Sequence, residues 1–267
     1  MSPTAPNGGS GGTPGRIHPP GSDYALVLEG VSRNFGALRA IEDVSFSVAA
    51  GERHAVIGAN GAGKTTLFNV ITGDFPATAG RVLFFGEDVT LHPPFERIRS
   101  GMRRTYQSSL LFRDLTVRDN LFLAVRGVTR NRYSFFRARN DATVEQLLER
   151  VRLARVADQP VSSLSHGQQR QLEIGMALAG APRLILFDEP AAGLSPGERA
   201  ELVALLRSLP SHMGFILIEH DLDIALRVVE QVTVMHNGRI LKHGTPAEIE
   251  NDAEVQAIYM GGKHLDS

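Results

Sequence analysis

The sequence predicts an α/β fold built around a parallel β-sheet. Two short and almost wholly apolar runs, RLILFDEP (183–190) and GFILIEHD (214–221), end in acidic residues or histidine, and such runs are typical of parallel strands buried on both faces. The segment between them, PGERAELVALLRSL (196–209), has proline at its start and the composition of a helix. Strands that alternate with helices along the chain indicate a parallel sheet covered by helices.

Composition and spacing predict the remaining elements, taken here in chain order. Residues 1–22 are rich in Gly, Pro and Ser, which predicts a disordered tail. The stretches 24–35, 40–48 and 80–89 have the β-branched and apolar content of strands. ERHAVIGANGAGKTTLFNVITGD (52–74) predicts a strand, a glycine-rich loop and a helix. From 108 to 161 the composition shifts to Arg, Leu and Glu at helical spacing, most clearly in ATVEQLLERVRL (142–153).

Length and composition narrow the class of protein. The chain has 267 residues, 42% of them apolar, and a formal net charge of −1, so it can bury a sizeable core and has no overall field that attracts nucleic acid or anionic lipid. It contains no cysteine, which excludes thiolate nucleophiles and Cys-ligated zinc. No apolar run reaches the roughly 18 to 20 residues that span a bilayer, and the N-terminus lacks the apolar core of a secretory signal. We expect a soluble cytoplasmic protein.

GANGAGKTT (58–66) fits the phosphate-binding pattern G-x-x-x-x-G-K-[ST] between a predicted strand and a predicted helix. Glycines let backbone N–H groups turn inward around an anion, and the helix that follows presents its N-terminus to phosphate. Lys64 is expected to reach the β- and γ-phosphate oxygens, and the Thr65 hydroxyl to bind Mg²⁺. The predicted nucleotide-binding residues of this loop are Gly58, Asn60, Gly61, Ala62, Gly63, Lys64, Thr65 and Thr66.

The run LILFDEP places Asp188 and Glu189 at the carboxyl end of a buried strand, the edge at which open α/β sheets bind ligands. Asp188 is expected to hold Mg²⁺ through water. Glu189, which would face the opposite side of the strand, is expected to orient and polarise the water that attacks the phosphate. A solvated acid pair in the turn before Pro190 is the alternative. The phosphate loop earlier in the chain favours the catalytic interpretation.

Two further polar residues follow predicted strands. His220 ends FILIEH and would emerge at the same sheet edge as Asp188, where a neutral imidazole can hydrogen-bond the γ-phosphate or the attacking water. Gln107 closes a predicted strand in RRTYQSS, and its amide can serve as a ligand for Mg²⁺ or water. Taken alone, each residue also fits a simpler interpretation: a structural His at a strand end, and an ordinary polar residue at an element boundary.

SSLSHGQQRQLEI (162–174) begins as a turn and continues as a helix with a polar tip. The tip combines the hydroxyl of Ser165, backbone N–H groups near Gly167 and the amide of Gln168. All of these can donate to an oxyanion, and the helix dipole assists them. Since the chain already has a phosphate loop, a second anion-binding tip indicates a shared nucleotide. In a head-to-tail dimer, the tip of one subunit would cover the γ-phosphate held by the other.

GANGAGKTT, RTYQ, LSHGQ, LILFDEP and EHD occur in the order and spacing of the nucleotide-binding subunit of ATP-binding cassette (ABC) transporters. The chain resembles that family over about residues 24–262. The resemblance implies a P-loop NTPase cassette with a parallel core sheet, an antiparallel β subdomain and an inserted α-helical subdomain. By this division 23–107 and 162–267 form the ATP-binding core with the antiparallel β subdomain, and 108–161 form the helical subdomain.

The resemblance also implies a mechanism. Two ATP molecules, with Mg²⁺, would lie between the phosphate loop of one subunit and the LSHGQ tip of the other. ATP closes the dimer, hydrolysis opens it, and partner membrane subunits respond to the movement. The implied tip residues are Ser165, Gly167 and Gln168; the catalytic residues are Glu189, His220 and Gln107; the metal ligands are Thr65, Gln107 and Asp188.

Three positions need separate treatment. Phe35, in RNFGAL, resembles the aromatic residue that stacks on adenine, and a core Phe in a strand is nearly as good an interpretation. The usual tip is Leu-Ser-Gly-Gly-Gln, whereas here His166 replaces the first Gly; the donors remain, and we hypothesise that the charge of His166 makes closure pH-sensitive. Ser195 stands where the family has an Asp that reaches across the dimer, which puts part of that cross-subunit hydrogen bonding in doubt.

Longer stretches narrow the resemblance. RTYQSSLLFRDLTVRDNL, LSHGQQRQLEIGMALA, DEPAAGLSP and GRILKHGTPAEIENDAEVQAIYMGG are similar to the ATP-binding subunit of branched-chain amino acid importers, and urea and short-amide importers have very similar subunits. The resemblance implies an ATPase at the cytoplasmic face of the membrane. Its partners would be permease subunits, a second ATP-binding subunit in a homo- or heterodimer and a solute-binding protein, with no nucleic acid. The resemblance names a class of cargo and not one particular solute, because nothing in such a subunit contacts the transported solute.

Two rival functions and two ambiguous segments remain. A soluble ABC ATPase acting on nucleic acid or ribosomes usually carries two cassettes, a long coiled coil or metal-binding Cys, and this chain has none of these. A small-molecule kinase would leave the LSHGQ motif unexplained.

Two segments have more than one interpretation. The segment RGVTRNRYSFFRARN (126–140), with five Arg and three aromatic residues, fits either a contact with anionic headgroups or permease loops or a solvated loop. LLF (110–112) fits either a docking site for a permease helix or core.

Overall fold

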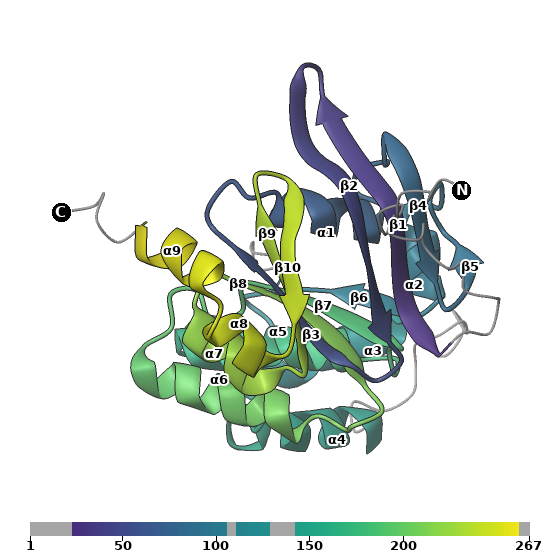
Figure 1. Ribbon diagram of the computed structural model, residues 1–267. Helices are drawn as coiled ribbons and strands as arrows, with labels where there is room; N and C mark the ends of the chain where they lie inside the picture. The colour runs from purple at the N-terminus through teal and green to yellow at the C-terminus, as the bar shows by residue number, and fades with distance from the viewer. Residues whose placement is uncertain (1–22, 106–110, 129–141, 262–267) are drawn as a thin grey trace, which may run out of the picture.

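The computed structural model describes residues 23–105, 111–128 and 142–261, and Figure 1 shows their arrangement. Within these residues the strands form two sheets, one with the strand order β2-β1-β4-β5 and one with the order β10-β9-β3-β8-β7-β6. The predicted tail 1–22, the predicted site residue Gln107 and most of the basic segment 126–140 lie outside the described residues. The predicted α/β fold with a parallel core sheet is confirmed.

The smaller sheet is antiparallel throughout. Its two long strands do not alternate strictly between buried and exposed positions: four consecutive residues near the start of β1 are buried, and β2 mixes buried, intermediate and exposed positions. The strands are β1 (Tyr24–Phe35), β2 (Leu38–Ala49), β4 (Ala79–Phe84) and β5 (Glu87–Asp88).

The larger sheet carries the strands that lead to the predicted site. All neighbouring pairs are parallel except β10, which folds back on β9 as an antiparallel partner. Since the strands are parallel, the ends of β3, β7 and β8 meet at one edge of the sheet. The strands are β3 (Arg53–Gly58), β6 (Met102–Arg104), β7 (Leu184–Asp188), β8 (Gly214–Glu219), β9 (Gln231–His236) and β10 (Arg239–Gly244).

Neighbouring residues of the central strands pack into two different cores. Ile185 and Phe187 of β7 lie in the core that the helices after β6 share, whereas Leu184 and Leu186 lie in the core between the large sheet and the antiparallel sheet. In Figure 1, α4, α6 and α7 lie below the large sheet, and α1 with the antiparallel sheet lies above it. This two-sided burial explains why these strands are continuously apolar in the sequence.

Nine α-helices and two short 3₁₀-helices, η1 (Ala154–Val156) and η2 (Val161–Ser163), occur in the described part of the chain, and none is long and apolar enough to cross a bilayer. α3, α4 and α5 pack against one another through buried residues such as Leu121, Leu148 and Leu172. The division of the chain near 107 and 161 stays a prediction. The helices are α1 (Lys64–Thr72), α2 (Pro94–Arg99), α3 (Val117–Val128), α4 (Ala142–Arg150), α5 (His166–Leu178), α6 (Pro196–Ser208), α7 (Leu222–Val228), α8 (Pro246–Glu250) and α9 (Ala253–Gly261).

Candidate nucleotide site

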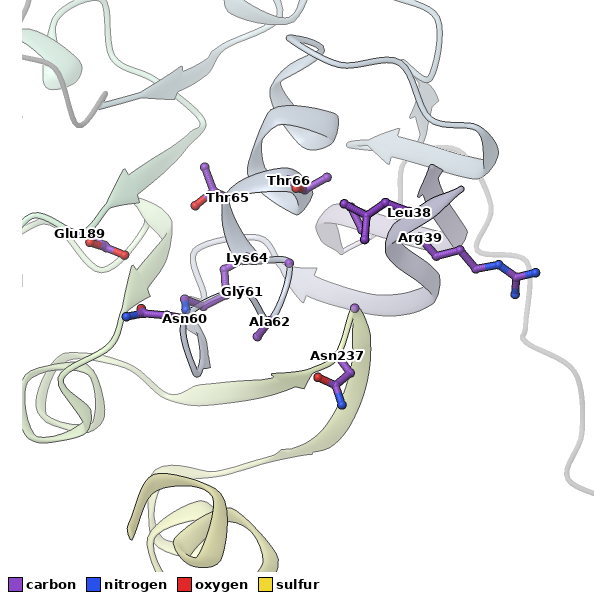
Figure 2. Close-up of a pocket in the computed structure, with 13 residues that line it drawn as sticks. Leu38, Arg39, Asn60, Gly61, Ala62, Lys64, Thr65, Thr66, Glu189 and Asn237 are labelled. Carbon is purple, nitrogen blue, oxygen red and sulfur yellow. The ribbon is translucent and has the colours of Figure 1, made fainter. Parts of the chain in front are cut away.

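A pocket of about 470 Å³ lies at the N-terminus of α1 (Figure 2). The chain segments that surround it come from the loop after β3, the start of β2, the turn between β9 and β10 and the residue after β7. Seven of the eight predicted loop residues line it together with Glu189, and Gly58 is the exception. The loop residues in the lining are Asn60, Gly61, Ala62, Gly63, Lys64, Thr65 and Thr66.

The start of α1 is shaped to receive an anion. β3 ends at Gly58 and the helix begins at Lys64, with Gly63 as the N-cap at φ 99°. A Cβ at Gly63 would lie 2.6 Å from the carbonyl oxygen of Ala40, so this left-handed position accepts glycine only. Gly63 has no side chain to cap the helix, and the first turn contains no acidic residue. The first N–H groups of α1 are therefore left for a phosphate oxygen.

Lys64 brings its ammonium group into the loop itself. Its Nζ donates hydrogen bonds to the carbonyl oxygens of Gly58, at 2.7 Å, and Ala59, at 3.0 Å. Burial lowers the pKa of Lys64, and the carboxylates of Glu189 and Asp188 act in the opposite direction. The cation therefore stands between the carbonyl groups of the loop and the two acids at the end of β7.

Asp188, the last residue of β7, is suited to hold a divalent cation. Its side chain is 1% exposed, and its Oδ2 accepts a hydrogen bond from Arg104 Nη2 at 2.6 Å. Its Oδ1 is buried and has no hydrogen-bond partner among the described residues, and a buried oxygen of this kind calls for a partner. The Thr65 hydroxyl at the pocket offers a second hard oxygen donor, the donor type that Mg²⁺ prefers. These residues therefore fit the predicted metal site.

Glu189 lines the pocket from a position just beyond the strand. The expectation that Glu189 belongs to this strand is wrong: β7 ends at Asp188, and Glu189 turns into the left-handed region at φ 46°. The orientation of Glu189 relative to Asp188, which was expected from strand alternation, stays a prediction. Its backbone N–H donates to the carbonyl oxygen of Ile218 at 3.0 Å. His220 Nδ1 lies 3.8 Å from Glu189 Oε2, too far for a hydrogen bond but at the same sheet edge, as expected.

The polar tip of α5 lies outside this pocket: none of its predicted residues is among the lining residues. Ser165 is the N-cap: its Oγ accepts from the Gln168 N–H, and Gln168 Oε1 accepts from the Ser165 N–H. The amide of Gln168 thus serves its own helix as half of a capping box. The N–H of Gly167 donates to Glu198 Oε1 at 2.8 Å. His166 is exposed, and its effect on the pH dependence of closure stays a prediction.

Phe35 is surface-exposed rather than a core residue, since 40% of it is accessible. Its ring packs edge-on against Phe75, and the Arg33 guanidinium lies 4.5 Å from its centroid. It is not among the residues that line the pocket, so its role toward adenine stays a prediction.

Sequence reasoning missed part of the pocket wall. The missed residues come from two hairpins, and one signal was available: an Asn-Gly pair between two strands is a strong turn signal. The start of β2 carried no comparable signal, because its approach to the loop depends on the tertiary fold. The missed residues are Leu38, Arg39, Ala40, Asn237 and Gly238.

Comparison with known proteins identifies the family. Residues 41–192 match the family model described as ABC transporter. The high-affinity branched-chain amino acid transport ATP-binding protein LivG of Escherichia coli is 35% identical over 252 residues, which cover 90% of this chain and 99% of LivG. The corresponding BraF protein of Pseudomonas aeruginosa is 34% identical over 248 residues, covering 88% of this chain and 97% of BraF.

Solved structures agree with the sequence relatives. An ATP-binding cassette of an ABC transporter in its ADP conformation has a TM-score of 0.80 and 34% identity, with 90% of this chain and 100% of that chain covered. The structure of cbiO1 from Clostridium perfringens, part of an ABC transporter complex, has a TM-score of 0.76 and 26% identity, with 91% of this chain and 99% of that chain covered. The chain belongs to the ABC transporter family and is one of its ATP-hydrolysing, ATP-binding cassettes, as the sequence motifs predict.

Proposed function

We propose that this chain is the motor subunit of an ABC importer for branched-chain amino acids or for a similar small polar solute such as urea or an amide. One observation carries the proposal: a phosphate loop and Glu189 line one pocket in a chain that is 35% identical, over 90% of its length, to a branched-chain amino acid transport protein. The transport role in the names of the relatives favours this function over a soluble ABC ATPase acting on nucleic acid or ribosomes.

Within one subunit, we assign the chemistry to residues around the pocket. The N-terminus of α1 and Lys64 bind the phosphates. Thr65 and Asp188 Oδ1 would hold Mg²⁺, which when bound supplies positive charge against the phosphate oxygens. Glu189 orients the attacking water, and His220 hydrogen-bonds the γ-phosphate or that water from its place beside Glu189. The role of Gln107 stays a prediction, since Gln107 lies outside the described residues.

Between subunits, we assign the tip of α5 to the nucleotide of a neighbour. Ser165, Gly167 and Gln168 do not line the pocket of their own chain, so a second copy or a sibling ATP-binding subunit is needed to bring such a tip to the phosphate. Membrane permease subunits and a solute-binding protein complete the proposed importer, with this subunit attached at the cytoplasmic face. We keep the division into a helical subdomain, 108–161, and a core, 23–107 and 162–267, as part of this proposal. The packing of α3 against α4 supports a helical subdomain, and both helices also contact α5 of the core.

Reconstitution tests this function. The chain is purified with permease subunits and a solute-binding protein, placed in vesicles and supplied with ATP, and ATP hydrolysis and uptake are measured with leucine, isoleucine, valine, urea and acetamide. We expect one of these solutes to stimulate both measurements, and the Lys64→Ala subunit to lose both. Co-purification with ribosomes or nucleic acid, together with no response to any of the solutes, would contradict the proposal.

A further inference from the structure

The carboxylate of Glu198 connects the N-termini of two helices. Its Oε2 accepts from the backbone N–H of Ser195 at 3.0 Å and from Ser195 Oγ at 2.8 Å. The first of these bonds, with the bond from the Glu198 N–H to Ser195 Oγ, forms the capping box of α6. Its Oε1 accepts from the backbone N–H of Gly167 at 2.8 Å and from Ser165 Oγ at 3.3 Å. Each oxygen therefore serves a different helix, and the second one engages the tip of α5.

The contact between Glu198 and α5 depends on both charge and close approach. Hydrogen bonds from the backbone N–H groups of Ser195 and Gly167 lower the pKa of Glu198 to about 2, so the side chain is an anion at neutral pH. A Cβ at Gly167 would lie 2.8 Å from both Cγ and Oε1 of Glu198. A residue with any side chain at this position would therefore push the carboxylate away from the helix tip.

We propose that Glu198 is an internal competitor of ATP: its Oε1 holds the donors that would otherwise bind the terminal phosphate of the neighbour's ATP. The inference rests on the proposed two-subunit nucleotide site. The backbone N–H of Gly167 carries one hydrogen and cannot be fully shared between a carboxylate oxygen and a phosphate oxygen. ATP at the seam must therefore displace Oε1, while Oε2 can stay with Ser195 and keep α6 capped.

This competition gives Glu198 a role in specificity. The terminal phosphate is the group that the tip of α5 would cover, so a diphosphate offers nothing to replace the carboxylate of Glu198. The displaced side chain also belongs to the segment that follows Glu189. Gly193 of that segment lies against His166, because a Cβ at Gly193 would be 3.5 Å from His166 Nδ1. Displacement of Glu198 would therefore loosen the contact between this segment and α5 when the dimer closes.

Replacement of Glu198 by Gln separates competition from capping. A glutamine can complete a capping box, as Gln168 does with Ser165 in α5. Ser195 and Gly167 donate to different oxygens of Glu198, and in glutamine one of these two positions becomes an NH₂ group, which cannot accept a hydrogen bond. The variant Glu198→Gln thus keeps the cap of α6 and releases the tip of α5. Glu248→Gln is the matched control, since Glu248 forms the same box with Thr245 at α8 and its hydrogen bonds within the described residues all go to Thr245.

Sedimentation velocity of the Glu189→Gln protein, which should bind ATP without hydrolysing it, measures the Mg·ATP concentration at which half the chains are dimeric. We expect Glu198→Gln to lower this concentration roughly tenfold, the order of one hydrogen bond to a charged group, and Glu248→Gln to leave it unchanged. Mg·ADP should give no dimers of the parent, because it lacks the phosphate that displaces Glu198. If Glu198→Gln fails to fold, the dimerisation midpoints of Glu198→Ala and Glu248→Ala are compared instead, because each of these variants loses one capping box.

The same variants are also compared in the reconstituted importer, with Glu189 intact, by measuring the ATP concentration at half-maximal hydrolysis. This second assay also tests the case in which the chain pairs with a sibling ATP-binding subunit. If the parent protein responds to ATP in either assay and Glu198→Gln leaves the midpoint unchanged or raises it, the competition is overturned and Glu198 is a positioning residue. If the parent neither pairs nor hydrolyses ATP in either assay, the proposed two-subunit site fails, and the inference fails with it.

Discussion

Arg104 Nη2 donates a hydrogen bond to Asp188 Oδ2 at 2.6 Å, which joins the last residue of β6 to the last residue of β7. The same guanidinium reaches Asn69 Oδ1 at 2.5 Å and Asp74 Oδ2 at 3.2 Å at the far end of α1. The Arg104 and Asp188 side chains are only 6% and 1% exposed. One buried cation therefore fixes the proposed metal ligand against the helix that follows the phosphate loop.

Loss of the Arg104 cation should destabilise the protein strongly. Arg104→Met leaves the buried carboxylate of Asp188 without its partner, and breaking such a pair costs about 3 to 5 kcal/mol. Urea unfolding of the variant and the parent measures the difference. The control is Arg81→Met, which breaks an exposed pair with Glu29 and should cost about 1 kcal/mol or less. Similar losses in the two variants would contradict this account of Arg104.

Glu219 should make stability depend on pH. Burial raises the pKa of this carboxyl from 4.5 to about 7, the N–H of Ala191 opposes the rise, and the charges of Glu189 and Asp221 add to it. Between pH 4.5 and 7 the folded carboxyl keeps its proton while the unfolded one has lost it. The free energy of unfolding therefore falls as the pH rises through this window, by about 3 kcal/mol in all, and the loss is complete above pH 7.

Glu219→Gln should remove this dependence, because an amide does not titrate and can still accept from the N–H of Ala191. Urea unfolding at pH 5 and at pH 8 measures it: the parent should lose stability relative to the variant at the higher pH. Glu248→Gln serves as the control, since the pKa of Glu248 is lowered and its contribution to stability is already complete at pH 5. Equal changes in the parent and in Glu219→Gln would refute the assignment.

The loop at 58–66 could be predicted from the sequence because its chemistry is local. Its key residues follow one another in the chain: a glycine at a left-handed N-cap, a lysine at the first helical position and a threonine after it. Their spacing alone therefore identifies them. The central strands were equally clear, since both faces of β7 and β8 are buried and the sequence shows continuous apolar runs. In both cases the residues that carry the signal are consecutive in the chain, although the burial itself comes from distant segments.

The rest of the site depends on contacts between distant segments. Glu189 still donates its N–H to Ile218 of the neighbouring strand, but its backbone turns into the left-handed region and β7 ends one residue earlier. Strand periodicity could not show this turn. The pair Ser195 and Glu198 has the spacing of a capping box, yet the second contact of Glu198, with Gly167 at the tip of α5, exists only in the folded chain. Arg104 precedes Gln107 by three residues in the sequence, yet only the packing of β6 beside β7 pairs Arg104 with Asp188.

Lys64→Ala should weaken nucleotide binding. The ammonium group is the cation of the loop that lines the pocket, and a hydrogen bond to a charged group contributes about 1.5 to 3 kcal/mol. Titration calorimetry with ATP should show the dissociation constant rising roughly 10- to 100-fold. Lys242→Ala, which removes an exposed ammonium paired with Asp252, should bind ATP as the parent does. An unchanged dissociation constant in Lys64→Ala would rule out the assigned contact.

Glu189→Gln should bind ATP and hydrolyse it very slowly. The amide keeps the size of the side chain at the pocket wall but cannot accept the proton of the attacking water, and loss of a general base lowers rates roughly 10²- to 10⁴-fold. Since Glu189 already holds a left-handed backbone conformation, glutamine meets the same strain and the fold should be kept. Phosphate release gives the rate, and calorimetry with ATP gives the affinity. A variant that hydrolyses ATP at more than about a tenth of the parent rate would show that another group activates the water, and the 3.8 Å neighbour His220 would be the first to replace.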